Sequence, residues 1–234
     1  MILYGRNAVR EALRGRRPVT RVWATAKAAG EGWLAGRTLE VVEADELAAL
    51  CGSPAHQGVC AEAAPYPYAD EAHLLAAPDP LIVALDQVSD PQNLGAICRT
   101  AEAAGVTGVV VPRHRAAEVT PAVCRASAGA VEHLALARVR NLADFLAQAK
   151  AAGCWCYGAQ AAGGVPYDHP DYAGGVVLVL GSEGRGLRPR VAAACDERIT
   201  IPRRGRVESL NVAAAAAVLV YEILQRRGAL DRNP

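Results

Sequence analysis

Apolar runs and helical patterns alternate along the chain from residue 81 onwards. Six apolar runs predict strands at 81–85, 106–111, 134–139, 154–159, 176–180 and 198–201. The segments between and after them show helical periodicity near 93–104, 121–128, 141–152, 188–195 and 210–226. Strands that alternate with helices are typical of a mostly parallel sheet covered on both faces. We therefore predict an α/β fold of this class.

The first 62 residues predict a smaller α/β unit. Its elements are a helix capped by Asn7, strands at 22–25 and 39–42, a helix at 46–50 and a closing strand at 56–62. Four prolines between residues 63 and 80 remove backbone donors and fix φ, which favours a linker or hinge. The predicted organisation is a unit at 1–62, a linker at 63–80 and a larger unit at 81–234.

Polar turns follow three of the predicted strands, after Leu85, Leu180 and Ile201. In open parallel sheets, ligands bind outside the carboxyl ends of the strands. We therefore expect the three turns to form one composite pocket. After the third turn, Ser209 is expected to open the last helix, with Asn211 in its first turn. Helix N-terminal amides and polar side chains would then face the pocket together.

The glycine-rich turn at 181–186 (GSEGRG) fits none of the common nucleotide or hydrolase motifs. It lacks the GxGxxG spacing of a dinucleotide fingerprint, and Leu187 and Arg188 stand where a P-loop needs lysine and serine or threonine. A nucleophile elbow is missing too, because Leu180 replaces its first glycine. Taken alone, the segment is equally well explained as a tight turn.

Composition favours a reduced, globular protein of the cytoplasm. Apolar residues make up 52% of the chain and charged residues 21%, and no apolar run reaches the roughly 18 to 20 residues that span a bilayer. The N-terminus lacks the pattern of a secretory signal. Seven scattered cysteines without a CxxC pair indicate free thiols, and no metal site is expected.

Charge is sorted along the chain although the formal net charge is only +1. The first 30 residues contain one acidic residue, Glu11, and seven basic ones: Arg6, Arg10, Arg14, Arg16, Arg17, Arg21 and Lys27. Further arginines flank the second and third polar turns, at 185, 188 and 190 and at 203, 204 and 206. Each cluster alone fits a solvated face, but three clusters around one pocket favour a polyanion such as nucleic acid.

Three segments resemble the motifs of a known family. Residues 93–100 (NLGAICRT), 180–187 (LGSEGRGL) and 201–215 (IPRRGRVESLNVAAA) resemble the three motifs of the SpoU (TrmH) class of RNA ribose 2′-O-methyltransferases, in the SPOUT superfamily. Residues 4–13 (YGRNAVREAL) and 56–59 (HQGV) resemble the small substrate-binding domain, similar to ribosomal protein L30e, that precedes the catalytic domain in many members. The resemblance implies a deep trefoil knot in the catalytic domain, S-adenosylmethionine as cofactor and a homodimer.

The resemblance also assigns site residues. Arg99 is placed against the ribose hydroxyl, where we expect it to stabilise developing alkoxide charge and to grip the target phosphate, because arginine does not readily lose a proton. Asn93 positions it, Glu183 is the acid of the second motif, and Ser209 and Asn211 frame the pocket. The residues expected to hold the cofactor are Leu180, Gly181, Gly184, Ile201, Pro202 and Leu210. Those expected to bind RNA phosphates are Arg6, Arg10, Arg14, Arg16 and Arg17.

The short L30e-like extension resembles the bacterial enzymes that methylate a guanosine of 23S ribosomal RNA. Thiostrepton-resistance methyltransferases share this layout, and transfer RNA enzymes share the catalytic motifs, so both substrates remain alternatives. A non-catalytic RNA-binding assembly factor is a further one, although it would not need Asn93, Arg99, Glu183 and Asn211 together. The last alternative is an α/β enzyme that binds a metabolite and has no relation to RNA.

Overall fold

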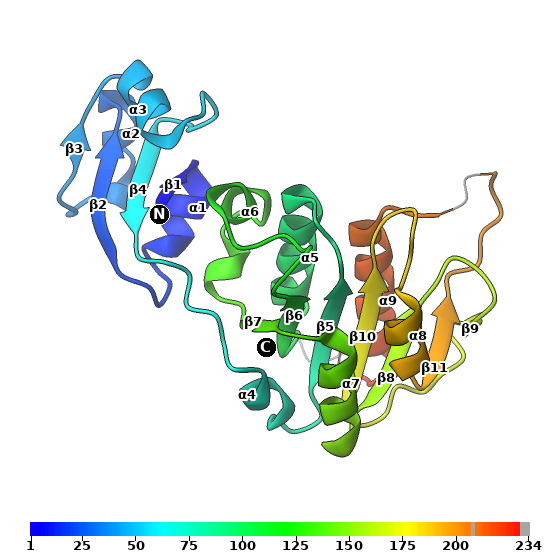
Figure 1. Cartoon of the computed structure of the whole chain (residues 1–234). Coiled ribbons are helices and arrows are strands. Elements are labelled where there is room, and N and C mark those ends of the chain that lie inside the picture. The colour runs from blue at the N-terminus through cyan, green and yellow to red at the C-terminus, as the bar shows by residue number, and fades with distance from the viewer. Residues whose placement is uncertain (207–208, 230–234) are drawn as a thin grey trace.

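A computed structural model describes residues 1–206 and 209–229 of the chain. Its larger unit contains a seven-stranded sheet in the order β7-β6-β5-β10-β8-β11-β9, and all neighbouring strands are parallel (Figure 1). The strands are β5 (Leu81–Asp86), β6 (Gly108–Pro112), β7 (Leu136–Val139), β8 (Trp155–Ala159), β9 (Val165–Pro166), β10 (Val176–Gly181) and β11 (Glu197–Thr200). The predicted α/β class is confirmed. Only the two-residue β9 was not predicted, because so short a segment carries no periodicity.

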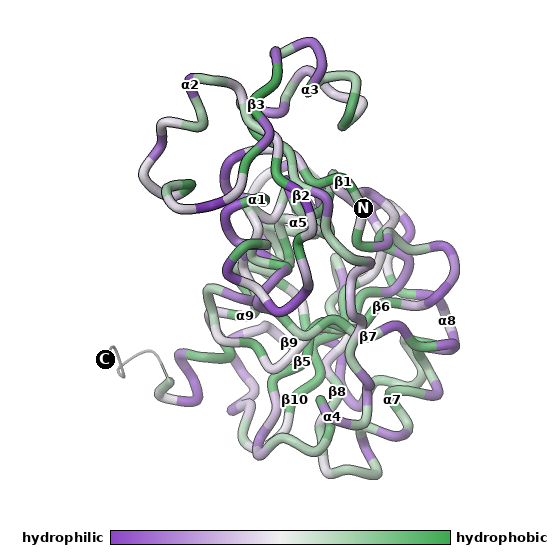
Figure 2. Tube along the Cα trace, turned by 90° about the vertical axis from the view of Figure 1, so that its left-hand side faces the viewer, coloured by the Kyte–Doolittle hydropathy of each residue, from purple (hydrophilic) through white to green (hydrophobic). Residues whose placement is uncertain are grey.

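Helices cover both faces of this sheet. One face packs against α5 (Pro91–Ala103), α6 (Pro121–Ala126) and α9 (Val212–Arg226), and a short turn of helix, η2 (Ala130–Glu132), follows α6. The other face packs against α4 (Glu71–Leu75), α7 (Leu142–Ala151) and α8 (Pro189–Ala194). Alternate residues of β10 enter the two cores, with Leu178 in the first and Val179 in the second. The central strands β5 and β10 are therefore buried on both faces and largely apolar, with Asp86 at the end of β5 as the exception, and Figure 2 shows them mostly in green.

Two of the site-bearing helices begin at different residues from those predicted. Helix α5 begins at Pro91, because Asp90 caps it by accepting a hydrogen bond from the Gln92 amide at 2.9 Å and proline is favoured at the first helical position. Asn93 is thus the third residue of the helix and not its first. Helix α9 is capped by Asn211, so the prediction that Ser209 opens this helix is wrong.

The N-terminal unit has a four-stranded sheet in the order β1-β4-β2-β3. Its elements are β1 (Ile2–Tyr4), α1 (Arg6–Ala12), β2 (Val19–Ala24), α2 (Ala26–Ala29), η1 (Gly32–Leu34), β3 (Glu40–Val41), α3 (Ala44–Cys51) and β4 (Val59–Ala63). The sequence patterns missed β1, α2 and η1, which are short. The expectation that Asn7 caps the first helix is also wrong, because α1 begins at Arg6 and Gly5 is in the capping position, with φ at 92°.

The proline-rich segment between the units packs against the larger unit. Ala69 forms a bridge with Ala137 beside β7, and the Tyr66 hydroxyl lies 2.8 Å from the Leu134 carbonyl oxygen. The units are also joined by a buried ion pair, in which Arg17 Nε donates to Glu132 Oε2 at 2.9 Å. One hydrophobic core runs through both units, including Leu3 and Val9 of the first. The segment at 63–80 is therefore held along its length and is not a free tether.

Candidate active site

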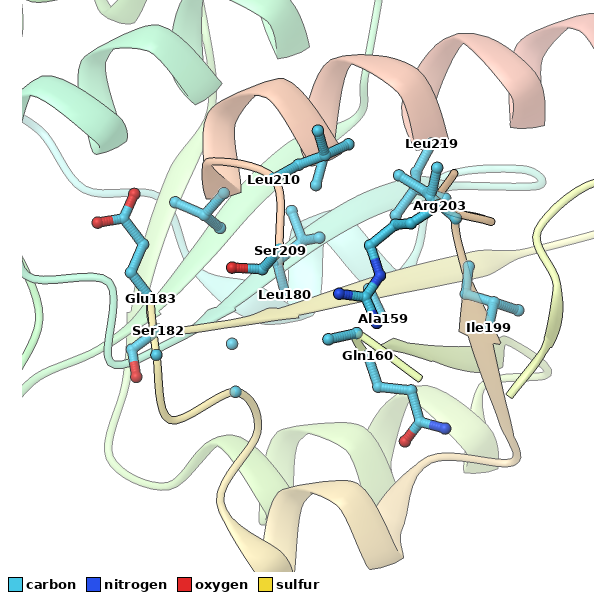
Figure 3. Close-up of a pocket in the computed structure, with 17 residues that line it drawn as sticks. Ala159, Gln160, Leu180, Ser182, Glu183, Ile199, Arg203, Ser209, Leu210 and Leu219 are labelled. Carbon is cyan, nitrogen blue, oxygen red and sulfur yellow. The ribbon is translucent and has the colours of Figure 1, made fainter. Parts of the chain in front are cut away.

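A cavity of about 220 Å³ opens at the carboxyl end of β10, beneath the start of α9 (Figure 3). Five of the six residues predicted to hold a cofactor line it: Leu180, Gly181, Gly184, Ile201 and Leu210. The sixth, Pro202, is exposed and lies outside the lining that the described residues form. Ser209 and Glu183 line the cavity too. Two residues of the third motif, 207 and 208, lie outside the described part of the chain.

The glycine turn after β10 forms one wall of this cavity. Ser182 and Gly186 pair as an isolated antiparallel bridge, so the turn folds back on its own start. A Cβ on Gly181 would lie 2.1 Å from the carbonyl carbon of Gly186, which leaves no room for any side chain. Gly184 has φ at 77°, in the left-handed region that favours glycine. The turn thus places bare backbone against the cavity, where main-chain donors and acceptors can read a ligand.

Asp86 fixes the far end of the turn. It is fully buried at the end of β5, and its two carboxylate oxygens accept hydrogen bonds from the Arg188 amide at 2.8 Å and from the Arg188 Nε at 2.7 Å. This contact ties the first polar turn to the second, since β5 and β10 are neighbours in the sheet. A role for Asp86 could not be predicted from the sequence, because a single aspartate at a strand end carries no distinguishing pattern.

Three of the predicted catalytic residues form one hydrogen-bonded cluster. Asn93 Nδ2 donates to Glu183 Oε1 at 3.0 Å, and Asn211 Nδ2 donates to the same oxygen at 2.7 Å. Asn211 Nδ2 also donates to Asn93 Oδ1 at 2.9 Å. Each residue comes from a different polar turn, so the predicted convergence of the three turns is confirmed for these residues. Within the described part of the chain, no hydrogen bond reaches Glu183 Oε2, which leaves this oxygen available as an acceptor.

Asn211 has a second role in the cluster. Its Oδ1 accepts hydrogen bonds from the amides of Ala213 at 2.8 Å and Ala214 at 3.3 Å, which caps α9. Ser209 precedes it on the loop and turns its hydroxyl toward the Glu183 side of the cavity in Figure 3. The Asn211 side chain therefore both caps α9 and joins the polar cluster.

Arg99 is not part of this cluster. It is exposed on α5 and does not line the cavity. Six residues after Asn93, it lies about 9 Å further along the helix axis and about a third of a turn away in angle. The single chain therefore brings together Asn93, Glu183, Ser209 and Asn211 but leaves Arg99 outside them.

Strand β8 contributes residues to the cavity that were not predicted from the sequence. Ala159, Gln160 and Ala161 at the end of this strand line it, because β8 lies between β10 and β11 in the sheet. Strand order cannot be read from apolar runs, although the glycine-rich segment after residue 159 was a signal for a turn. Arg203 was noted only for its charge, yet its side chain extends into the cavity in Figure 3.

Four of the five predicted RNA-binding arginines are at the surface. Arg6, Arg14 and Arg16 are exposed and Arg10 is half-exposed, while Glu31 pairs with Arg6 and Glu11 pairs with Arg10 and Arg14. Burial acts to raise the pKa of Glu11, but hydrogen bonds from His133 and Arg10 outweigh it and the pKa is lowered. The prediction for Arg17 is wrong, because its side chain is 2% exposed and is enclosed with Glu132.

Two further properties of the described residues bear on the site. No group of three or more His, Cys, Asp or Glu side chains in this part of the chain is placed to hold a metal ion. Among the same residues, no helix is both long and apolar enough to cross a membrane. The described lining of the cavity combines apolar side chains, open backbone, the Glu183 carboxylate and the Arg203 guanidinium, which suits a ligand with an aromatic ring, polar edges and charged groups of both signs.

Comparison with known proteins gives a consistent result. The sequence model of the SpoU rRNA Methylase family matches residues 80–221, and that of the RNA 2′-O ribose methyltransferase substrate-binding domain matches residues 2–69. An uncharacterized tRNA/rRNA methyltransferase of Synechocystis is 37% identical over 97% of this chain, which spans 63% of that protein. A putative TrmH family tRNA/rRNA methyltransferase of Bacillus subtilis is 37% identical over 95% of this chain and 94% of its own length.

A solved structure shares the whole architecture. The SpoU methyltransferase AviRb of Streptomyces viridochromogenes, in complex with the cofactor S-adenosylmethionine, superposes with a TM-score of 0.83 at 27% identity, covering 98% of this chain and 91% of that one. The lining of the present cavity fits the same group. Family match, relatives and fold agree: the chain belongs to the SpoU family of methyltransferases, whose cofactor is S-adenosylmethionine.

Proposed function

We propose that the protein transfers a methyl group from S-adenosylmethionine to a ribose 2′-hydroxyl of RNA, and that its target is a guanosine of 23S ribosomal RNA. The observation that carries the proposal is the cluster of Asn93, Glu183 and Asn211 at the rim of the cavity. It sets a free carboxylate oxygen and polar amides next to the place where a methyl donor fits. A ribose hydroxyl is a poor nucleophile at neutral pH, so orientation and charge stabilisation are what such a site must supply.

The cavity residues fit the parts of the cofactor. Main-chain groups around Gly181, Ile201 and Leu210 would read the polar edge of adenine, and the side chains of Leu180 and Leu219 supply apolar contact. Glu183 is the carboxylate of the lining and would favour a sulfonium by charge. The bound cofactor supplies an electrophilic methyl group, and the protein residues orient it and exclude water.

The two amides hold Glu183 in place and leave one oxygen for the incoming hydroxyl. Both amide nitrogens donate to Oε1, so Oε2 is the atom that would accept a hydrogen bond from a 2′-hydroxyl. Ser209 stands on the same side of the cavity and would position the sugar. Arg99, which is exposed on α5 and lies outside this cluster in the single chain, would contact the phosphate beside the target ribose once RNA is bound and would stabilise negative charge from there.

The N-terminal unit would bind the RNA. Arg6, Arg10, Arg14 and Arg16 present charge at the surface of one small region, and phosphate contacts of this kind give affinity without sequence readout. The matched substrate-binding domain at 2–69 supports the same role. We favour ribosomal RNA as the substrate because the family model that matches the larger unit is that of an rRNA methylase family. Transfer RNA and the ribosomal site of the thiostrepton-resistance enzymes are the alternatives.

We also propose a homodimer, a cytoplasmic location and the knotted chain path that the family resemblance implies. Helix α9 leaves Val218 and Tyr221 exposed at 39% and 42%, which are large apolar groups that a second copy could cover. Light scattering on the purified protein measures the mass directly. A monomer at micromolar concentration would contradict this part of the proposal.

The decisive experiment is incubation with methyl-labelled S-adenosylmethionine and unmodified total RNA, followed by mapping of the label. We expect label on one ribose 2′-oxygen of 23S ribosomal RNA. Label on transfer RNA would correct the substrate, and label on a base would contradict 2′-O chemistry. RNA binding without any transfer would favour the non-catalytic assembly factor instead.

A further inference from the structure

A second cavity, of about 320 Å³, lies between the two units. Its walls come from both: Tyr4, Asn7 and Gln57 belong to the N-terminal unit, and Gln92 and Arg125 to the larger one. Figure 1 shows β1 and α1 beside α6 at this junction. We call it the junction cleft. None of the residues assigned above to the active site lines it.

We propose that the junction cleft binds the base of an unpaired RNA nucleotide that flanks the methylated one. The inference rests on the proposed function, because it takes RNA as the substrate. It concerns a different set of residues from those that contact the cofactor.

The side chains in the cleft match the edge of a base better than a phosphate. Asn7, Gln57 and Gln92 each carry an amide, which donates and accepts hydrogen bonds side by side, as the edges of bases do. Among the described residues that line the cleft, Arg125 is the single cation and none carries a carboxylate. A phosphate site would instead collect several cations or backbone amides.

The amides are also free to act. Asn7 and Gln92 are exposed, and neither side chain makes a hydrogen bond within the described part of the chain. Gln57 uses its Oε1 to accept from the Arg6 amide at 2.9 Å, which leaves its NH₂ group pointing away from that contact. Arg125 lies over the Tyr4 ring at 5.7 Å, and the outer face of its guanidinium is a stacking surface of the kind that holds unpaired bases in RNA complexes.

Two residues that line the cleft have an unusual backbone conformation. Gln57 and Ala128 adopt positive φ values of 55° and 52°, which side-chain-bearing residues seldom do. The buried His56 holds the first of these turns, since its Nδ1 accepts from the Gly58 amide at 3.1 Å. The HQGV segment, whose role the active site does not explain, thus serves to aim Gln57 into the cleft.

The cleft and the active site are mechanically connected through α5. Gln92 lines the cleft, and the next residue, Asn93, belongs to the catalytic cluster. Helix α6, which supplies Arg125, packs so closely on α5 that a Cβ on Gly95 would lie 2.4 Å from the Ala126 Cβ. A base seated in the cleft would therefore be held at a fixed separation from the reacting ribose, as positioning of a flanking nucleotide requires.

The test compares RNA affinity between variants. The double variant Asn7→Ala/Gln92→Ala removes two exposed amides from helices, where alanine is well tolerated. Arg125→Gln removes the cation, and Arg140→Gln is the matched control because Arg140 is also exposed but lies outside the cleft. The probe is unmodified 23S ribosomal RNA transcribed in vitro, and the readouts are its Kd, the dependence of Kd on salt, and the affinity for S-adenosylmethionine.

We expect the double variant to bind the transcript at least about tenfold more weakly, because two amide–base pairs are lost and a factor of ten corresponds to only about 1.4 kcal/mol. Its salt dependence and its affinity for S-adenosylmethionine should match those of the unaltered protein, and Arg140→Gln should stay within twofold. Binding by the double variant within twofold overturns the proposal. An effect of Arg125→Gln alone, with a salt slope lower by about 1, overturns it in favour of a phosphate site.

The same reactions separate this inference from the proposed function. Methyl transfer by the unaltered protein tests the function, whereas the difference in Kd between variants tests the cleft. If the unaltered protein transfers no methyl group but the double variant still binds the transcript more weakly, only the proposed function is contradicted. An unaltered protein that does not bind the transcript contradicts both.

Discussion

Replacing Asn211 should separate the structural and catalytic roles of one side chain. Asn211→Ala removes the cap of α9 and both hydrogen bonds that Nδ2 donates. Loss of such a cap costs about 1 kcal/mol, which lowers Tm by about 2–4 °C in a domain of this size. The hydrogen bond to the carboxylate of Glu183, at 2.7 Å, is of the charged type worth about 1.5–3 kcal/mol. If it is needed in the transition state, the rate falls between about tenfold and a hundredfold.

Asn211→Ser is the matched control. Serine caps a helix about as well as asparagine, but its shorter side chain, with the oxygen committed to the cap, does not reach Glu183. We expect Asn211→Ser to keep most of the Tm and to lose as much activity as Asn211→Ala. The assay pairs thermal unfolding with single-turnover methyl transfer at saturating cofactor. A serine variant with near-normal rate would refute the role given to the amide, and equal loss of Tm in both variants would refute the role of the cap.

Four further predictions concern other parts of the chain. Arg99→Ala should abolish methyl transfer while calorimetry shows cofactor binding largely intact; near-normal activity would contradict the role of Arg99. Gly181→Ala should abolish cofactor binding and lower Tm, because its Cβ would lie 2.1 Å from Gly186, whereas Gly32→Ala, with no atom within 4 Å, should change neither. Glu132→Gln should lower the free energy of unfolding in urea by about 3–5 kcal/mol, because it leaves Arg17 buried without its charged partner. Glu40→Gln, which breaks an exposed ion pair, should leave this free energy almost unchanged, and similar losses in the two variants would contradict this reasoning. Burial raises the pKa of Cys98, Cys124 and Cys156 from 9.0 to about 12. These thiols should therefore resist alkylation at pH 8 until urea is added, and rapid alkylation of the native protein would contradict their burial. The free energy of unfolding should fall as the pH rises above about 9, because the thiols ionise first in the unfolded chain.

The larger unit could be predicted from its sequence because its elements are long and consistent. Apolar runs such as 176–180 are buried on both faces of a parallel sheet, so pattern and structure report the same constraint. Helix starts were less predictable. Asp90 and Asn211 both precede strong helices, but Asn93 and Ser209 are also plausible starts, and local propensity does not choose between neighbouring polar residues.

The active site was predictable in composition but not in arrangement. Asn93, Glu183 and Asn211 could be placed at strand ends, and parallel strands bring their ends to one edge. The order of the strands, however, depends on long-range packing, so the part played by Gln160 at the end of β8 could not be foreseen. Burial of Arg17 depends on Glu132, which lies 115 residues away, and a run of arginines gives no sign of which one is paired.

The most direct test is a crystal structure of the protein with S-adenosylmethionine bound. We expect the methyl-bearing sulfur next to Glu183 and Asn211, with adenine against the backbone of Gly181, Ile201 and Leu210. A cofactor bound elsewhere, or bound in this cavity with its methyl group turned away from the three-residue cluster, would contradict the central claim.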